Sequence, residues 1–283
     1  MVALYFLLAA LRIALPYLYG ALAGVWSERA GVVHIGLEGL LLSAAFAATV
    51  GAAVGGPLVG LGAALATCLA LSLLFAGLVV YGRANAIVVG VALNWLADGG
   101  TRFFLRALYD SSSNSPRVDA WASGPLVERV HPLMVLGLLL VALTAWALRH
   151  TSFGLRVRAA GSAPAALRAA AISVERVQLR SLLVAGAIAS LGGVFLAWNN
   201  HQFVAGMSNG RGFLALAALV IGRREPLGVA VAALGLGAAE ALEVTLFAQG
   251  ASVPHWIMQA LPHVLTLVVL ALRRPRPPQP QAA

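Results

Sequence analysis

The 283-residue chain contains no lysine, a single cysteine and few charged residues. Charged side chains make up 10% of the chain, against about 25% in an ordinary soluble domain. The lone cysteine, Cys68, excludes a disulfide within the chain and does not make a metal site by itself. Without lysine there is no phosphate-binding GxxxxGK[ST] motif, and HExxH is also missing. The chain therefore carries no recognisable nucleotide-hydrolysing or metalloprotease centre.

What the chain has in abundance is apolar sequence. Hydrophobic residues make up 60% of it, and the mean hydropathy is +0.89. One water-facing globule cannot hide so much apolar surface, so a lipid bilayer must solvate most of it. Apolar runs long enough to cross a bilayer as helices lie near 3–25, 33–50, 57–80, 86–108, 131–148, 181–198, 226–247 and 255–272.

The predicted fold is an all-α bundle of about eight or nine transmembrane spans, with broken helices. A shorter apolar run, 212–222, is either a ninth crossing or a re-entrant half-helix. The run that begins at residue 3 is too long for the apolar part of a signal peptide and is expected to stay in place. We therefore expect one membrane domain over 1–272, followed by a tail rich in proline and arginine over 273–283.

Arginine sets the expected orientation, because basic residues in short loops stay on the cytoplasmic side. The segment 151–180, TSFGLRVRAAGSAPAALRAAAISVERVQLR, is a basic island between two apolar runs. It is predicted to lie inside, with Arg223, Arg224 and the tail, which places the loop 109–130 and the N-terminus outside. The formal net charge of +9 then needs no nucleic acid to explain it, since the arginines cluster at the ends of apolar runs.

Two segments in opposite halves of the chain resemble each other in kind. Residues 30–45 read AGVVHIGLEGLLLSAA and residues 205–220 read AGMSNGRGFLALAALV. Each begins with glycines and polar residues and continues as an apolar helix, and the expected orientation makes the two run in opposite directions. Transporters built on inverted repeats have such segments beside the substrate path. The alternative is that the glycines only let helices pack closely.

Glu38, in the stretch His34-Ile35-Gly36-Leu37-Glu38-Gly39, is the sharpest local feature. A carboxylate at membrane depth costs about 2.5–3.5 kcal/mol, and each helical glycine costs about 1 kcal/mol relative to alanine. A broken helix that exposes Glu38 to a water-filled path would compensate for both costs. The alternative is structural, with Glu38 capping its helix or tying it to a neighbour such as Arg12 or Arg83.

Other polar residues also fall within or beside the apolar runs. Those of the first set either contact the solute or form hydrogen bonds between helices. Asn94, Asp98 and Thr101 share one helical face by their spacing, and Asn85 lies at the cytoplasmic entrance. Another set marks either an outer gate or a solvated loop: Asn199, Asn200, His201, Gln202, Asn209 and Arg211. Glu240, Glu243 and His263 are scattered over the last spans, which argues against a proton relay.

Four segments together resemble the inner-membrane permeases of ABC importers of the ribose/branched-chain-amino-acid type, especially the nucleoside and simple-sugar permeases. GVVHIGLEGLLLSAAFAA resembles the family's NIGLEGM segment, and ANAIVVGVALNWLADGGTRFF resembles its AN-x-I-V-x-G-x-A-L-N segment. FGLRVRAAGSAPAALRAAAISVERVQ is similar to its cytoplasmic coupling loop, and GMSNGRGFLALAALVIGRREPLG to its G-x-G-F-I-A-L-A-A signature. The matches extend from about residue 27 to residue 240.

The resemblance implies a permease subunit in the cell's inner membrane that is not itself an enzyme. It implies a second permease subunit, an extracytoplasmic solute-binding protein, and two cytosolic ATPase subunits that hold the ATP and Mg²⁺. The chain is short for the family, which implies a heterodimer with a longer permease as readily as a homodimer. His34 replaces a common asparagine, which would alter the substrate or make its binding respond to pH.

The resemblance and the polar sets together give two groups of candidate residues. The expected substrate-pathway residues are Glu38, His34, Asn85, Asn94, Asp98 and Asn209. The expected contacts to the ATPase are Arg156, Arg158, Ala163, Pro164 and Arg168, with a short helix over 163–171 in which Pro164 suits the first turn.

The expected solute is small, polar and neutral: a nucleoside or a simple sugar. One alternative is a permease of the same family for branched-chain amino acids. Another is an ion-coupled carrier with Glu38, Asp98 and Glu240 as coupling carboxylates. A scaffold without a pathway is disfavoured, because polar residues buried in several spans would only cost it insertion energy.

Overall fold

The computed structural model describes residues 2–118 and 131–248, together with residues 264 and 271. In these residues the chain is helical, with one isolated β-bridge between Asn114 and Val204. The helices are α1 Val2–Arg29, α2 Leu37–Gly55, α3 Pro57–Ala76 with its π-helical continuation η1 Gly77–Tyr81, α4 Ala86–Tyr109, α6 Pro132–His150, α7 Ser152–Ser162, α8 Pro164–Ala169, α9 Val174–Asn200, α10 Arg211–Ile221 and α11 Pro226–Ala248. This confirms the predicted all-α polytopic bundle.

Six of the described helices are long and apolar enough to span a bilayer: α1, α2, α3 with η1, α6, α9 and α11. Helix α4 has 24 residues, but it is less apolar because it carries Asp98, Arg102 and Arg106. The predicted run 255–272 lies outside the residues that the structure describes, except for 264 and 271. The count of eight or nine spans therefore stays a prediction.

Two boundaries differ from those read from the sequence. The run 33–50 becomes helical only at Leu37, because residues 30–36 form turns and extended chain. The segment 151–180 is not one loop: it contains α7 and α8, and α9 already begins at Val174. Ser173 caps α9 by accepting a hydrogen bond from the backbone N–H of Arg176, which starts the helix within the basic island.

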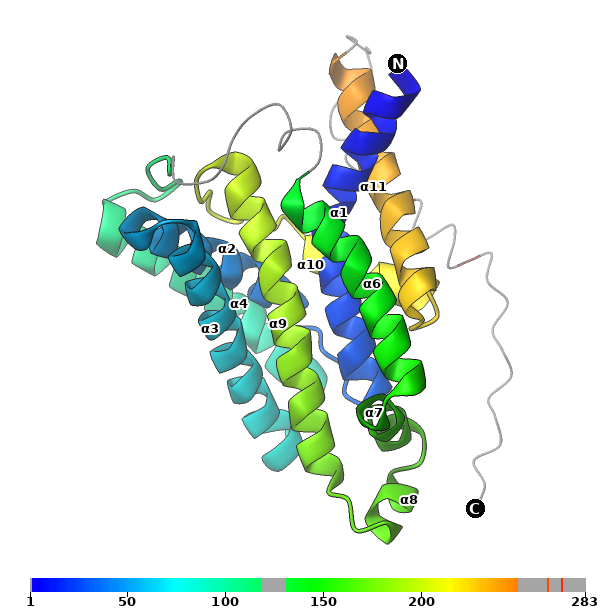
Figure 1. Cartoon of the computed structure of the whole chain (residues 1–283). Helices are drawn as coiled ribbons and strands as arrows, with labels where there is room; N and C mark the ends of the chain where they lie inside the picture. The colour runs from blue at the N-terminus through cyan, green and yellow to red at the C-terminus, as the bar shows by residue number, and fades with distance from the viewer. Residues whose placement is uncertain (1, 119–130, 249–263, 265–270, 272–283) are drawn as a thin grey trace.

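Helices α1 and α9 form the centre of the bundle (Figure 1). Helices α2, α3 and α4 lie on one side of α9, and α6 and α11 lie on the side of α1. Small residues allow close approach of the helices: a Cβ at Gly193 of α9 would lie 2.5 Å from the Leu41 carbonyl oxygen of α2. A Cβ at Gly237 of α11 would lie 2.6 Å from the Ala10 oxygen of α1. Such small-residue contacts are typical of helix packing in lipid.

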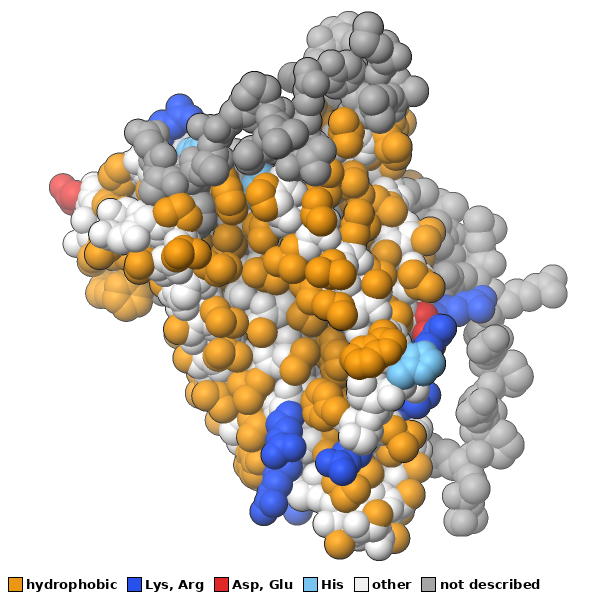
Figure 2. Space-filling model, viewed as in Figure 1, with side chains coloured by type: hydrophobic (Ala, Val, Ile, Leu, Met, Phe, Trp, Pro, Cys, Tyr) orange, Lys and Arg blue, Asp and Glu red, His pale blue; other side chains and the backbone are white. Residues whose placement is uncertain are grey.

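The two ends of the bundle differ in character. Helices α7 and α8 lie at the end opposite the N-terminus of α1 (Figure 1). At the end away from α8, residues 113–118 pair with 201–205 through hydrogen bonds such as Ser115 N–H to the Phe203 oxygen, 2.9 Å. Figure 2 shows arginine side chains near α7 and α8 and hydrophobic side chains over the flank between the two ends. This distribution suits a bilayer around the flank and a cytoplasmic location for α7 and α8.

A labelling experiment tests that orientation. Cys68 is fully buried, so the variant Cys68→Ala gives a background in which new cysteines report their own position. In intact cells, a membrane-impermeant maleimide is expected to label Ser113→Cys and to leave Ala166→Cys of α8 unlabelled until the membrane is permeabilised. Both positions are exposed in the bundle. Labelling of Ala166→Cys in intact cells would reverse the assigned orientation.

Candidate functional site

Helix α10 is a half-helix inside the bundle. Its 11 residues span about 16 Å, roughly half of the bilayer core. Residues 201–210 enter from the end where α9 stops, and α10 then runs to the opposite end, where Arg224 pairs with Glu28 of α1. Helix α2 runs the other way, since its Phe46 packs edge-to-face against Phe203. The two glycine-rich segments thus run in opposite directions. Because residues 201–224 pass from one end of the bundle to the other, the structure favours a crossing, half loop and half helix, over a re-entrant course for 212–222.

The N-termini of these two elements meet at Glu38, in the first turn of α2. One carboxylate oxygen accepts hydrogen bonds from Ser208 Oγ at 2.6 Å and Gly210 N–H at 2.9 Å. The other accepts from Gly212 N–H at 2.6 Å. The first N–H groups of a helix have no partner within it and carry partial positive charge, so a carboxylate is the group that suits them. Glu38 therefore ties α2 to α10, and the partners are not Arg12 or Arg83.

The clasp formed by Glu38 and the start of α10 depends on a very close approach of the two backbones. A Cβ added to Gly212 would collide with the backbone of Glu38 and lie 2.8 Å from its Oε2. Asn94 of α4 holds the same region from the other side: its Oδ1 accepts from Gly39 N–H at 2.8 Å, and its Nδ2 donates to the Ile35 oxygen at 3.2 Å. The carboxylate and the amide together satisfy the irregular backbone at the start of both helices.

A second polar contact joins the start of α10 to α11. Arg211, the first residue of α10, donates to Glu240 of α11 at 2.6 Å, and Tyr17 of α1 donates to the other oxygen of Glu240. A cation at a helix N-terminus is unfavourable by itself, and the carboxylate of Glu240 neutralises it. The sequence marked Arg211 and Glu240 separately, but it did not pair them. The signal that could have suggested the pair is that Arg211 and Glu240 carry opposite charges and lie in two apolar segments that follow each other in the chain.

Two of the expected pathway residues, Asn85 and Asp98, lie apart from the clasp. Asn85 caps α4 at its exposed start, accepting from Ile87 N–H at 2.9 Å. Asp98 is about half exposed and bonds Arg102 of the same helix at 3.1 Å.

His34 and Asn209 contrast in their exposure. His34 is fully buried against Phe75, with ring centroids 4.0 Å apart. Asn209 is exposed, with a left-handed φ of 45°, and lies in the chain between Ser208 and Gly210, two of the donors to Glu38. The fold thus brings Glu38, Asn94 and Asn209 to one region, with the His34 ring beside Gly36 at the start of α2, and leaves Asn85 and Asp98 outside it. Contact of all six with solute stays a prediction.

The predicted short helix of the basic island is present as α8, beginning at Pro164 after Ala163. After the helix ends at Ala169, Ala171 has a left-handed φ of 56° and Ile172 N–H bonds the Leu167 oxygen at 2.9 Å, as in a Schellman motif. Leu167 is the buried residue of α8, and the helix projects from the bundle (Figure 1). Such a projection offers a contact surface to another protein.

The expected ATPase contacts are not equally accessible. Arg168 on α8 and Arg156 on α7 are exposed. Arg158 is only half-buried and, with Arg29 and Glu225, lines a small cavity of about 90 Å³. Arg156 and Arg168 are therefore available to a partner, whereas Arg158 is at least partly engaged in the packing of α7 on the bundle.

Backbone contacts connect α7 to the segment that leads to Glu38. A Cβ at Gly31, just after α1, would lie 3.1 Å from Gly161 Cα of α7, and Trp26 stacks on Phe153 at 5.6 Å. At the start of α9, Ser181 Oγ donates to the Trp26 oxygen at 2.7 Å. The chain then passes from Gly31 directly through residues 32–36 into the first turn of α2. These contacts form a continuous connection from α7 to the first turn of α2.

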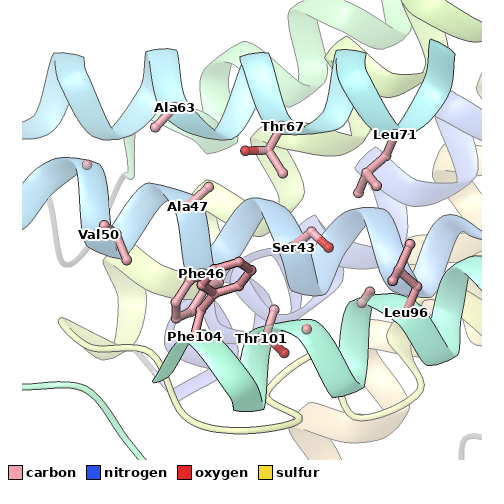
Figure 3. A pocket seen from close by; sticks show the side chains of 13 residues that line it. Ser43, Phe46, Ala47, Val50, Ala63, Thr67, Leu71, Leu96, Thr101 and Phe104 are labelled. Carbon is pink, nitrogen blue, oxygen red and sulfur yellow. The ribbon is translucent and has the colours of Figure 1, made fainter. Parts of the chain in front are cut away.

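A groove of about 490 Å³ lies between α2, α3 and α4 (Figure 3). Helix α2 forms its floor and the other two helices its walls. The lining is apolar apart from three hydroxyls, those of Ser43, Thr67 and Thr101. Thr101 belonged to the predicted polar set, but Ser43 and Thr67 were missed because a single hydroxyl residue is ordinary in an apolar run. The complete lining is Ser43, Phe46, Ala47, Val50, Gly51, Ala63, Thr67, Leu71, Leu96, Ala97, Gly100, Thr101 and Phe104.

Comparison with known families agrees with these features. Residues 6–270 match the family described as "Branched-chain amino acid transport system / permease component". The chain belongs to this permease family. It is 32% identical to the guanosine ABC transporter permease protein NupQ of Bacillus subtilis, over 93% of this chain and 89% of that protein. No solved structure matches the chain.

Two further relatives have different named solutes. The nucleoside ABC transporter permease protein NupC of Lactococcus lactis is 29% identical over 91% of this chain and 88% of its own length. The putative glucose ABC transporter permease protein TsgC13 of Haloferax volcanii is 29% identical over 83% of this chain and 76% of its own length. The chain is thus a multi-pass permease similar to proteins named for nucleosides and for a sugar.

Removing the Glu38 carboxylate tests the clasp. Glu38→Ala leaves the Ser208 hydroxyl and the N–H groups of Gly210 and Gly212 without their acceptor inside the bundle. Each buried unsatisfied group costs about 1–3 kcal/mol, so we expect a loss of about 3 kcal/mol or more in the stability of the purified protein. Thermal unfolding in detergent measures it. The control is Asp98→Asn, which removes a charge from an exposed pair and should change the stability by less than about 1 kcal/mol. Equal effects of the two changes would contradict the structural role of Glu38.

Proposed function

We propose that the chain is the translocation subunit of an ATP-driven importer that carries a nucleoside across the cell's inner membrane. The observation that carries the proposal is the meeting of α2 and α10 at Glu38. Irregular backbone at membrane depth is tolerated where it is buried in protein or lines a water-filled cavity, and paired interrupted segments mark the substrate path in transporters. The NupQ and NupC names support a nucleoside as the solute, and the TsgC13 name keeps a simple sugar as the second candidate.

An ion-coupled carrier is less well supported, because its three candidate carboxylates are already engaged. Glu38 accepts three hydrogen bonds from α10 and the residues before it, Asp98 pairs with Arg102, and Glu240 binds both Arg211 and Tyr17. A coupling group has to exchange its proton or ion during transport, which would require each of these contacts to break. A branched-chain amino acid fits less well because the relatives above are named for nucleosides and glucose.

The proposed energy source is a pair of separate ATPase subunits that hold ATP and Mg²⁺ and dock on α7 and α8. The exposed Arg156 and Arg168 suit acidic groups on such a partner. Closure of the ATPases would move α8, and the contact of Gly161 with Gly31 would pass the displacement to residues 32–36 and Glu38. Alternating access would follow from rocking of the two halves about the clasp.

The proposed second permease subunit covers the face of α4 that carries Asp98 and Arg102. These side chains lie near the middle of α4, and about half of each is exposed in the single chain. Charged side chains facing lipid near mid-membrane are costly, so this face needs either a protein partner or water. The extracytoplasmic solute-binding protein would dock at the opposite end from α8, near residues 113–118 and 201–205.

An uptake panel tests the function. The chain is produced together with its proposed ATPase, binding-protein and second-permease partners, and uptake of radiolabelled guanosine, glucose and leucine is measured. We expect guanosine uptake that disappears when the ATPase carries an inactivating Walker A substitution. Uptake of leucine but not of guanosine would refute the solute assignment. Guanosine uptake that persists with the inactive ATPase and collapses with an ion gradient would refute the energy source.

A charge reversal on α8 tests the ATPase contact. Arg168→Glu is expected to lower guanosine uptake at least 10-fold, because it places repulsion where attraction is proposed, while the amount of protein in the membrane stays the same. The matched control is Arg106→Glu, the same change on an exposed residue at the far end of α4, which should retain most of the uptake. Normal uptake by Arg168→Glu would show that α8 does not carry the coupling.

A further inference from the structure

We infer that the groove between α2, α3 and α4 is a nucleoside-binding site within the permease, an inference that rests on the proposed function and specifies it. Its volume of about 490 Å³ lies within the range of small-molecule pockets, about 300–1,000 Å³. Such pockets are mostly apolar and hold a few polar groups that orient the ligand. Here the polar groups are the hydroxyls of Ser43, Thr67 and Thr101, one from each of the three helices (Figure 3).

The hydroxyls of Ser43 and Thr67 differ from those of Thr49 and Thr245. Serine and threonine in membrane helices commonly return their hydrogen bond to the carbonyl four residues earlier. Thr49 does so to the Ala45 oxygen at 2.9 Å, and Thr245 does so to the Ala241 oxygen at 2.7 Å. Within the described part of the chain, Ser43 and Thr67 donate to no acceptor. Their donor and acceptor capacity is therefore available to a polar occupant of the groove.

Thr101 adds a third contact of the complementary kind. Its Oγ1 donates to the Asp98 backbone oxygen at 3.2 Å, so its remaining lone pairs are free to accept a hydrogen bond from a ligand. Ser43 and Thr67 can donate as well as accept. The three side chains therefore offer the donor and acceptor types that the hydroxyls of a ribose can bond. Glycine and alanine residues on the groove wall and floor, such as Ala47 and Gly100, leave room for the ring.

Two phenylalanines supply the aromatic surface that a nucleobase needs. Phe46 on the floor and Phe104 on the α4 wall both line the groove (Figure 3). Phe46 is held in place by its edge-to-face contact with Phe203, with centroids 5.1 Å apart. Stacking on aromatic side chains tolerates any base, because every base has a π-face. The combination of aromatic faces and hydroxyls favours a nucleoside over a simple sugar, which has hydroxyls but no aromatic face.

The groove is also placed to respond to the clasp. Ser43 follows Glu38 by five residues on α2, and Thr101 follows Asn94 by seven residues on α4. Asn94 holds the start of α2 through Gly39, so the helix that forms the floor and the helix that forms one wall are joined at the clasp. A movement of α2 at Glu38 therefore changes the width of the groove, which would couple occupancy to the transport cycle.

Photolabelling locates the site directly. The assembled permease–ATPase complex in nanodiscs, without binding protein, is irradiated with 8-azidoguanosine and the labelled peptides are mapped. We expect label on α2, α3 or α4 that guanosine prevents and glucose does not. The double variant Ser43→Ala/Thr67→Val should raise the guanosine concentration needed for half-protection about 10-fold, because it removes two hydrogen bonds. Phe104→Leu should raise it about 5-fold or more through lost stacking.

The control is Thr49→Val, which removes a hydroxyl from α2 that bonds its own helix and does not line the groove; its half-protection concentration should match the wild type. Unchanged protection in the double variant, or label mapped to other helices, would refute the site. If a lipid chain or an apolar partner helix fills the groove, the result differs. The double variant would then unfold at a higher temperature, because its new side chains are apolar, and guanosine would protect against labelling as it does in the wild type. If the wild type takes up guanosine but the groove variants leave protection unchanged, the groove is rejected as the site and the proposed function stands. If the wild type takes up no nucleoside, the proposed function itself is rejected.

Discussion

The hydrogen bonds that Glu38 accepts from Ser208, Gly210 and Gly212 hold together the two interrupted elements of this membrane bundle. A half-helix such as α10 exposes unpaired N–H groups at its start, and lipid offers them no acceptor. One carboxylate at the start of α2 satisfies two of these groups and the Ser208 hydroxyl. Its own charge is in turn compensated by the N–H groups and by the dipole of α10. Without this contact the N–H groups at the interruption before α10 would lack their acceptor.

The other polar contacts of the bundle extend outward from that clasp. Asn94 fixes the start of α2 to α4, and Arg211 with Glu240 fixes the start of α10 to α11. At the end near α8, Glu225 pairs with Arg29 and with Arg149. These contacts join helices that would otherwise slide on apolar surfaces, since lipid supplies little hydrophobic force between helices. Residues 30–36 connect the α8 end to the clasp.

Polar residues in the membrane therefore fall into two groups, distinguished by whether the bundle itself provides their partner. Glu38, Asn94 and Glu240 are conspicuous in the sequence, yet each is satisfied by other parts of the chain. Ser43 and Thr67 are inconspicuous, yet their hydroxyls face a groove without a partner in the described residues. The high cost of inserting charged and amide side chains into a membrane singles out the first group in the sequence. Contact with solute, however, is inferred from hydroxyls that have no hydrogen-bond partner in the bundle, and only the three-dimensional structure shows which these are.

Composition and local pattern alone determined that this is a helical membrane protein, where most of its helices lie, that Pro164 begins a short helix in the basic island, and which permease family it resembles. These properties depend on hydropathy and on neighbouring residues. The tertiary structure decided the partner of Glu38, the pairing of Arg211 with Glu240, the separation of Asn85 and Asp98 from the clasp, and the three-helix groove. Glu38 and Gly212 are 174 residues apart, and helical periodicity cannot specify which face of one span meets another. That choice depends on the packing of small residues and on the requirement that each buried polar group find a partner.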